Sequence, residues 1–250
     1  MISISNLSYY YDRKLILKNI NLQIPKGVVT ALIGANGAGK STLLSLIARL
    51  ISCQQGRITV DDLEVGSCPT SELATRLSIL PQVPEVTTRL SVAELVAFGR
   101  YPYNRGRKSP EDETIIANAV ELFELQDVRR RSLDTLSGGQ RQRALLAMIF
   151  AQDTDYLLLD EPLNNLDIAG SRKLMTLVRT LAAEHGKTIV IVLHDINYAC
   201  AYADWIVTMV DGETGPIGEP NKLVTRELIE NVFNTDADVH SVGGRPLVAV

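Results

Sequence analysis

One glycine-rich segment has the residue types and spacing needed to hold a triphosphate. Gly34–Ser41 reads GANGAGKS and matches GxxxxGK[ST], between a predicted strand at Val28–Ile33 and an apolar-periodic helix around Leu43–Leu50. Glycines let backbone N–H groups point at phosphate oxygens, and the helix adds the positive end of its dipole. Lys40 is suited to the β and γ phosphates and the Ser41 hydroxyl to a bound Mg²⁺. We therefore predict a nucleoside triphosphate site here.

Two carboxylates follow another apolar run. Asp160 and Glu161 come directly after Tyr156–Leu159, at the strand end where open α/β sheets bind ligands. We assign Asp160 to the Mg²⁺ site and Glu161 to the base that positions and polarises water, a role that contributes roughly 10²–10⁴-fold to a rate. An acidic pair in this place is equally compatible with a helix cap.

A second glycine pair opens a predicted helix. Leu136–Gln140 reads LSGGQ, and Ser137 with Gln140 has the spacing of a capping box. Capping does not explain Gly138 and Gly139, which lower helix propensity and leave the helix N-terminus open to an anion. We interpret the segment as a second phosphate-binding surface. Because the chain has one copy of each motif and no internal duplication, two chains are needed to complete such a two-sided site.

The elements that must position these residues indicate an α/β fold. Alternating apolar residues within 2–24 predict a short antiparallel sheet, whereas Val28–Ile33, Tyr156–Leu159 and Ile189–Leu193 are continuous apolar runs typical of parallel strands buried on both faces. Helical spacing over Ser171–Glu184 places a βαβ crossover between the last two runs.

The middle of the chain has a different pattern. It contains a helix-like stretch at Val92–Phe98, a basic loop at Arg100–Lys108 and a predicted helix over Pro110–Leu125. We interpret residues 84–151 as a helical subdomain inserted into one domain. The two parts of the predicted nucleotide-binding core are residues 1–83 and 152–250.

Composition narrows the class of protein. The 250 residues are 46% hydrophobic, with 25 Lys plus Arg against 29 Asp plus Glu, a net charge of −4 that fits a soluble globular protein and argues against a nucleic-acid coat. The longest apolar run, Ala144–Ala151, is far shorter than the roughly 20 residues that span a bilayer. The N-terminus lacks the features of a secretory signal, so we expect a cytoplasmic location.

Cysteine and histidine residues do not form metal-binding patterns. Without a CxxC pair or a His cluster, the sequence predicts neither a disulfide framework nor a structural zinc site. These residues are Cys53, Cys68, Cys200, His185, His194 and His240.

The motifs together resemble the ATP-binding cassette (ABC) ATPase family. The resemblance rests on Gly34–Ser41, Leu136–Gln140, the LLLDEP at Leu157–Pro162 and the later His194, and it spans nearly the whole chain in the family's order. It implies a P-loop NTPase (RecA-like) core with an N-terminal antiparallel β subdomain and an inserted α-helical subdomain. It also implies a homodimer in which two ATP molecules each lie between one chain's P-loop and the other chain's LSGGQ.

The resemblance assigns further residues to an ATP and Mg²⁺ site. Gln82 resembles the glutamine that contacts Mg²⁺ and the attacking water, His194 the histidine at the γ phosphate, and Asn164–Asp167 the D-loop. Tyr11 fits the aromatic position that stacks on adenine, a contact of roughly 1–3 kcal/mol by analogy with base stacking. Packing in the core is the alternative for Tyr11 and His194.

The expected site comprises three sets. The catalytic residues are Glu161, His194, Gln82 and Lys40. The ATP-binding residues are Tyr11, Gly34, Ala35, Asn36, Gly37, Ala38, Gly39, Lys40, Ser41, Thr42, Ser137, Gly138, Gly139, Gln140 and Asp167. The Mg²⁺ ligands are Ser41, Gln82 and Asp160.

The insert carries the resemblance to a transport branch. Leu90–Tyr103 resembles the insert of importer ATPases for ferric siderophores, haem and cobalamin, and its GRYP segment with the DEPLNNLD spelling looks most like the ferric-siderophore branch. This implies a peripheral ATPase on the cytoplasmic face of the membrane, bound to two transmembrane permease subunits near Phe98–Tyr103 and served by a separate binding protein. The alternatives are a haem, cobalamin or metal-ion importer, or a soluble non-transport ATPase.

The basic residues of the insert have two interpretations. They form a solvated loop, or they face lipid head groups or the membrane partner. The cluster consists of Arg100, Arg105, Arg107 and Lys108.

Overall fold

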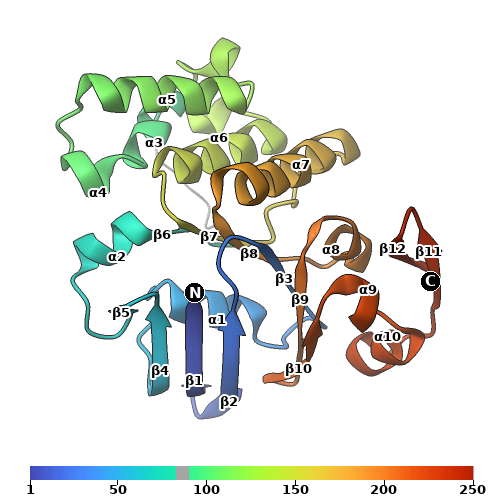
Figure 1. Ribbon diagram of the computed structural model, residues 1–250. Coiled ribbons are helices and arrows are strands. Elements are labelled where there is room, and N and C mark those ends of the chain that lie inside the picture. The colour runs from blue at the N-terminus through green and yellow to red at the C-terminus, as the bar shows by residue number, and fades with distance from the viewer. Residues whose placement is uncertain (83–89, 250) are drawn as a thin grey trace.

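Two larger β-sheets, a two-stranded hairpin and the helices around them form the described part of the molecule (Figure 1). The computed structural model describes residues 1–82 and 90–249. A four-stranded sheet has the order β2-β1-β4-β5, a six-stranded sheet has the order β10-β9-β3-β8-β7-β6, and a hairpin pairs β11 with β12. The strands are β1 (Ile2–Tyr11), β2 (Lys14–Ile24), β3 (Val29–Ile33), β4 (Gln55–Val60), β5 (Leu63–Glu64), β6 (Leu77–Leu80), β7 (Tyr156–Asp160), β8 (Thr188–Val192), β9 (Trp205–Val210), β10 (Glu213–Gly218), β11 (Asp238–Val242) and β12 (Arg245–Ala249).

Helices cover the six-stranded sheet on one side, where α3 to α6 gather at the top of Figure 1 above α7. No helix in residues 1–82 and 90–249 is long and apolar enough to cross a membrane. The helices are α1 (Lys40–Ile47), α2 (Thr70–Arg76), α3 (Val92–Phe98), α4 (Tyr101–Asn104), α5 (Pro110–Leu122), α6 (Gly138–Ala151), α7 (Ile168–His185), α8 (Ile196–Tyr202), α9 (Pro220–Leu223) and α10 (Arg226–Phe233), with short 3₁₀ turns at Gln126–Val128 and Leu133–Thr135.

The pairing of the strands confirms the predicted α/β class. β1 pairs antiparallel with β2 and with β4, so the N-terminal antiparallel sheet is present. In the larger sheet, β3, β7 and β8 run parallel, and α7 connects β7 to β8 as the predicted βαβ crossover. The fold is therefore a mixed sheet with one antiparallel edge strand, β10.

The six-stranded sheet separates two apolar clusters. Ala31 and Ile33 of β3 face the cluster that includes α3, α5, α6 and α7, whereas Leu32 faces the cluster that includes α1 and the antiparallel sheet. In β8, Ile191 and Val190 divide in the same way. Because successive side chains point to opposite faces of a strand, the continuous apolar runs supply both clusters.

The inserted part begins its helices with local caps. α3, α5 and α6 each start with a capping box. The pairs are Ser91 with Glu94, Ser109 with Asp112, and Ser137 with Gln140. The first residues of the predicted insert, 84–89, lie outside the described residues. The division of the chain into core and helical subdomain stays a prediction, since both parts share one apolar cluster.

The predicted basic loop at 100–108 was wrong in two respects. It contains the short helix α4, and its first residue, Arg100, is only 6% exposed and paired with Asp112. The remaining basic residues of the loop are exposed, as expected: Arg105, Arg107 and Lys108. The predicted helix over 110–125 also ends earlier, at Leu122.

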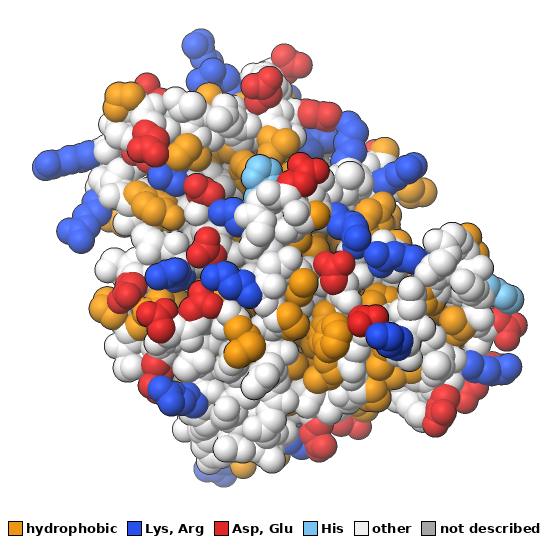
Figure 2. Space-filling view, viewed as in Figure 1, with side chains coloured by type: hydrophobic (Ala, Val, Ile, Leu, Met, Phe, Trp, Pro, Cys, Tyr) orange, Lys and Arg blue, Asp and Glu red, His pale blue; other side chains and the backbone are white. Residues whose placement is uncertain are grey.

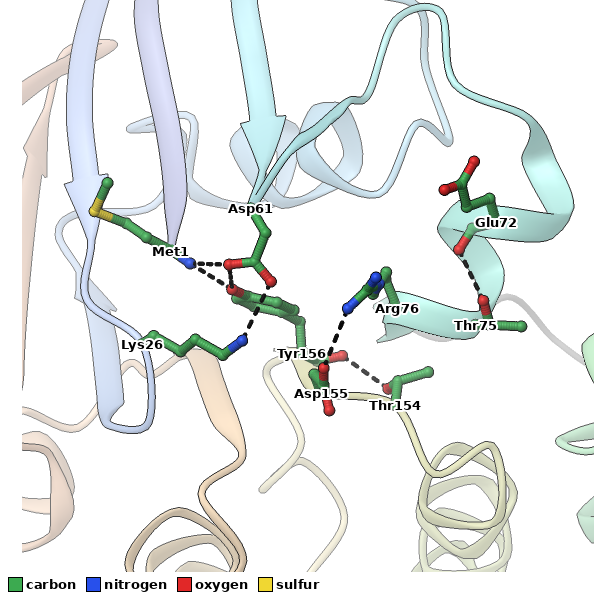
Figure 3. A network of polar contacts seen from close by, with 9 residues as sticks. All are labelled: Met1, Lys26, Asp61, Glu72, Thr75, Arg76, Thr154, Asp155 and Tyr156. Carbon is green, nitrogen blue, oxygen red and sulfur yellow. Dashed lines mark hydrogen bonds and ion pairs between the residues drawn. The ribbon is translucent and has the colours of Figure 1, made fainter.

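A polar network joins the antiparallel sheet to the core (Figure 3). The Asp61 carboxylate, after β4, lies 2.5 Å from both the Met1 ammonium and the Tyr156 hydroxyl of β7, and 3.3 Å from the Lys26 ammonium. Burial alone raises the pKa of Asp61, but hydrogen bonds from these three groups outweigh it and lower the pKa to about 2. The network therefore favours the ionised carboxylate.

Candidate functional site

A cleft of about 760 Å³ opens where β3 and β7 end and α1 begins. It brings together residues that are more than 150 positions apart in the sequence, including all four predicted catalytic residues. The residues that line it are Lys14, Ile16, Asn36, Gly37, Gly39, Lys40, Ser41, Thr42, Gln82, Glu161 and His194.

Two glycines of the predicted phosphate loop are required by the backbone. Gly34 has φ +151°, and a Cβ placed there would lie 2.1 Å from the Met209 carbonyl oxygen. Gly39, the N-cap of α1, has φ +96°, and its Cβ would lie 2.6 Å from a Leu17 methyl group. L-residues with a side chain fit neither position, so the loop takes a conformation that only glycine allows.

Lys40 lies at the base of this loop. It is buried, and its ammonium group donates hydrogen bonds to the carbonyl oxygens of Gly34 at 2.8 Å and Ala35 at 2.9 Å. Burial lowers the pKa of Lys40, while the nearby charges of Glu161 and Asp160 oppose that shift. The Lys40 ammonium is thus held at the loop by two carbonyl oxygens, which it can exchange for phosphate oxygens.

Asp160 and Ser41 place two oxygens together beside the loop. The Ser41 hydroxyl donates a hydrogen bond to Asp160 Oδ1 at 3.0 Å. Burial raises the pKa of Asp160, and the bond from Ser41 works in the opposite direction. Within the described part of the chain no group of three or more His, Cys, Asp or Glu side chains could hold a metal. One hydroxyl and one carboxylate fit Mg²⁺, which binds through few protein oxygens together with phosphates and water.

Three side chains converge on the Glu161 carboxylate. Its Oε2 accepts hydrogen bonds from Gln82 Nε2 at 3.0 Å and from Asn164 Nδ2 at 2.9 Å, and its Oε1 lies 2.6 Å from His194 Nε2. Glu161 itself has φ +49°, which is uncommon for a residue with a long side chain. The predicted catalytic residues Gln82, Glu161 and His194 therefore form one hydrogen-bonded group at the cleft.

The alternative of a helix cap for the acidic pair is wrong. The next helix, α7, begins at Ile168 with Asp167 as its N-cap, whose carboxylate accepts a hydrogen bond from the Gly170 N–H at 2.7 Å. Asp160 is still part of β7 and Glu161 follows it. Asp167, predicted to bind ATP, is exposed and lies outside the residues that line the cleft.

The second predicted phosphate-binding surface lies outside the cleft. Ser137 caps α6, accepting the Gln140 N–H at 3.3 Å, and the Gln140 side chain accepts the Ser137 N–H at 3.1 Å. A Cβ at Gly138 or Gly139 would lie 3.3 to 3.4 Å from atoms of Asn165. One chain thus keeps Ser137–Gln140 apart from the phosphate loop and close to its own predicted D-loop.

Core packing is excluded for Tyr11 and His194. Tyr11 is 65% exposed at the end of β1, and the His194 side chain is 44% exposed. Tyr11 does not line the cleft, but its pairing partner across the hairpin, Lys14, does. Its contact with adenine stays a prediction.

The sequence interpretation missed several contributors. Lys14 and Ile16 line the cleft from the start of β2, and only the hairpin register could have indicated them. Gln142 of α6 is buried and donates a hydrogen bond to the Pro162 carbonyl at 3.0 Å, which ties α6 to the segment after Glu161. Asn164 was expected only as part of the D-loop, and no local pattern indicates its bond to Glu161.

A separate groove of about 270 Å³ lies on the inserted part. It carries two exposed aromatic side chains, Phe98 at 52% and Tyr101 at 56%. The groove residues are Leu90, Glu94, Ala97, Phe98, Tyr101, Asn104, Gly106 and Lys108. We call this set the aromatic groove.

Comparison with known proteins gives the same family from sequence and structure. The ABC transporter family profile matches residues 17–164. The petrobactin import ATP-binding protein YclP of Bacillus subtilis (strain 168) is 44% identical over 97% of this chain and 96% of its own length. The ferric enterobactin transport ATP-binding protein FepC of Escherichia coli (strain K12) is 39% identical over 97% of this chain and 91% of its own.

A solved structure shares the fold. The dimeric structure of MJ0796, a bacterial ABC transporter cassette, superposes with a TM-score of 0.79 at 30% identity, covering 88% of this chain and 98% of that one. The same cassette has been solved as a dimer in a post-hydrolysis state bound to ADP and Pi, with the same TM-score, identity and coverage. With the phosphate loop, the Ser-Gly-Gly helix start and the acidic pair after β7 in the family's order, this chain belongs to the ABC transporter family as an ATP-binding cassette.

Proposed function

We propose that this chain is the ATP-hydrolysing subunit of an importer for iron(III)–siderophore complexes. The observation that carries the proposal is the near full-length similarity to ATP-binding proteins named for petrobactin import and ferric enterobactin transport. The cleft supports the ATPase part, because it holds a buried cation, an oxygen pair and a bound carboxylate around a glycine loop. The alternative substrates are haem, cobalamin or a metal ion.

In this proposal the cleft residues divide the work of hydrolysis. The loop N–H groups and Lys40 hold the β and γ phosphates, and Ser41, Asp160 and Gln82 are the residues that would hold Mg²⁺. When bound, the ion offsets the charge of the phosphates. Glu161 orients the attacking water and polarises it, and no covalent enzyme intermediate is needed.

The hydrogen bonds of Glu161 suggest how the cleft responds to ATP. Gln82 and His194 bind the carboxylate in the structure; Gln82 is also assigned to Mg²⁺ and the attacking water, and His194 to the γ phosphate. When ATP enters, these two side chains exchange the carboxylate for the nucleotide and leave Glu161 free to accept a proton from water. Asn164 then remains to hold the carboxylate in place.

Two chains are required to enclose the nucleotide. Ser137, Gly138 and Gly139 are not at the cleft of their own chain, and MJ0796 forms a dimer. We infer a head-to-tail homodimer in which the helix start of one chain meets the phosphates held by the other.

The aromatic groove is the proposed docking site for the permease. Its exposed rings and apolar floor suit an amphipathic helix from each of two transmembrane subunits. The chain then sits peripherally on the cytoplasmic face of the membrane, and a separate binding protein delivers the substrate.

No nucleic-acid partner is proposed. On the face drawn in Figure 2, Lys and Arg side chains are interspersed with Asp and Glu, and no large positively charged patch lies there that would attract nucleic acid.

The test is uptake of iron in cells with and without this gene. Cells that lack the gene are expected to lose accumulation of a radiolabelled ferric siderophore and regain it when the intact gene is returned. Labelled haem and cobalamin serve as controls and should enter both strains equally. Loss of haem or cobalamin uptake instead would reassign the substrate, and a chain that co-purifies with no hydrophobic permease would exclude transport.

A further inference from the structure

Arg100 is a buried cation held by three contacts. Its Nε donates to Asp112 Oδ1 at 2.8 Å, and Nη1 donates to the Ala151 carbonyl oxygen at 3.1 Å. The guanidinium carbon lies 4.1 Å from the centre of the Tyr103 ring. Arg100 is 6% exposed and Asp112 3%, so water does not screen the pair.

Asp112 gathers the beginning of α5 and the end of α4. Its Oδ2 accepts hydrogen bonds from the Ser109 N–H at 2.9 Å, the Ser109 hydroxyl at 3.0 Å and Asn104 Nδ2 at 3.0 Å. The Ser109 N–H and the Arg100 guanidinium hold the pKa of Asp112 well below its usual range. The carboxylate is therefore ionised across the whole working range of pH, and the ion pair does not switch.

The same contacts attach the aromatic groove to the last turn of α6. In the sequence, Arg100 lies two residues after Phe98 and one before Tyr101, so the two exposed rings of the groove flank it. A Cβ at Gly99 would lie 2.2 Å from the Met148 carbonyl oxygen, which shows how closely the two backbones approach. This part of the groove cannot move away from α6 while Arg100 holds Ala151.

α6 continues without a break from this attachment to the Ser-Gly-Gly segment. The helix spans Gly138–Ala151, 14 residues, which is about 21 Å at 1.5 Å per residue. Ser137 caps one end and Arg100 binds the other. At the latter end, Gln152 also donates to the Ala74 carbonyl at 2.7 Å, which links the helix to α2.

We propose that Arg100 is a positioning residue that fixes the aromatic groove to the end of α6, so that movement of a docked permease reaches Ser137–Gly139 at the other end of that helix. The inference rests on the proposed function, because it assigns the groove to the permease. Arg100 touches neither nucleotide nor partner and acts through α6.

Arginine is required for this role because of its shape. A planar guanidinium can point one donor at Asp112 and another at Ala151 while its face covers Tyr103. Lysine keeps the charge but presents a single ammonium that cannot reproduce the three contacts together. Arg100→Lys therefore separates the charge from the attachment.

The experiment uses the subunit in complex with its permease, with the ligand-loaded binding protein added or omitted. In Arg100→Lys, ATP hydrolysis by the isolated subunit should stay within about twofold of wild type. Stimulation of hydrolysis by permease and binding protein should fall at least about fivefold, the lower range of typical coupling between sites. Asp112→Asn should give the same separation.

The matched control is Arg107→Lys, at an exposed basic residue of the same segment. In this variant, stimulation of ATP hydrolysis by permease and binding protein should be unchanged. If Arg100→Lys fails to fold, Ser109→Ala removes a neutral partner of Asp112 that lies outside the aromatic groove and should reduce stimulation in part. Normal stimulation in Arg100→Lys or Asp112→Asn would overturn the proposal. An equal loss of basal and stimulated hydrolysis with a lowered Tm would also overturn it, since the pair would then be structural only.

Failure of the proposed function gives a different result. If the wild-type subunit neither binds a permease nor is stimulated by one, the transport assignment fails before any variant is compared. If wild type is stimulated and Arg100→Lys responds equally, transport stands and only the role of Arg100 fails.

Discussion

The phosphate loop and the Ser-Gly-Gly helix start are both glycine-rich, yet the structure uses their glycines differently. Gly34 and Gly39 adopt positive φ angles with no room for a Cβ, so folding itself requires them. Gly138 and Gly139 lie in α6 without positive φ. A Cβ on Gly138 would make a tight contact of 3.3 Å with the Asn165 side chain, and one on Gly139 would lie 3.4 Å from the Asn165 carbonyl oxygen. Backbone geometry therefore does not require the second pair. Close packing on Asn165 and the proposed contact with the partner's nucleotide are the two explanations for it.

The two regions also differ in how their polar groups are satisfied. In the cleft, Glu161 binds Gln82 from a distant segment, whereas Lys40 binds carbonyl oxygens of its own loop. The partners of both residues are expected to change when ATP binds. At the helix start, Ser137 and Gln140 satisfy each other locally. The cleft thus depends on contacts between separate segments of the chain, whereas the helix start is satisfied within itself, as the proposed contact with a second chain requires.

The largest effect is expected in the cleft. Glu161→Gln should lower phosphate release by roughly 10²–10⁴-fold while ATP still binds, because the amide preserves the hydrogen-bonding shape but cannot accept a proton from water. Phosphate release is measured in steady state, and gel filtration with ATP should show a trapped dimer. Unchanged release would contradict the role of Glu161, and Glu111→Gln, an exposed carboxylate on α5, is the control.

Substitution of a phosphate-loop glycine should act on stability. Gly34→Ala is expected to reduce the free energy of unfolding by about 3 kcal/mol, because the new methyl group collides with the Met209 carbonyl in a backbone conformation that alanine disfavours. Urea denaturation measures the change. Gly37→Ala is the comparison, since φ is also positive there but no atom lies within 4 Å, and a smaller loss is expected.

The corresponding substitution at the helix start should do the opposite. Gly139→Ala is expected to leave the free energy of unfolding unchanged or raise it by about 0.5–1 kcal/mol, because alanine favours the helix. ATP hydrolysis should nevertheless fall at least about tenfold, since the methyl group blocks close approach of the partner's phosphates. Normal hydrolysis at normal stability would remove the distinction between the two glycine pairs.

The smallest effect concerns the junction beside the antiparallel sheet. Because folding lowers the pKa of Asp61 to about 2, its contribution is present above the unfolded pKa near 3.9 and is lost as pH falls toward 2. Asp61→Asn should reduce the free energy of unfolding by about 1 kcal/mol at pH 7, since the carboxylate is partly exposed. The difference from wild type should shrink between pH 4 and pH 2 in urea titrations, and a constant difference would exclude linkage to this carboxyl.

Local spacing predicted much of the fold and of the nucleotide half of the site. The strand runs, the crossover through α7 and the cap at Ser137 follow from periodicity and residue type, which act over a few positions. Gln82 and His194 came only from the family resemblance, because nothing near either residue in the sequence indicates a shared partner at Glu161.

Arg100 shows why the remainder could not be predicted. Four basic residues close together are typical of a solvated loop, and three of them are exposed. The fourth is buried because Asp112 and Ala151, 12 and 51 positions away, surround it. A buried charge depends on partners that only tertiary packing brings together, and periodicity does not carry that information.

The central strands of the six-stranded sheet are covered by both apolar clusters. β3 and β8 lie side by side in that sheet, each paired with a strand on either side. Opening either cluster alone leaves their amides shielded by the other. In hydrogen–deuterium exchange, the amide protons of β3 and β8 should therefore be the last to exchange. Amide protons of the antiparallel sheet and of the inserted helices should exchange earlier, when either of those parts opens locally.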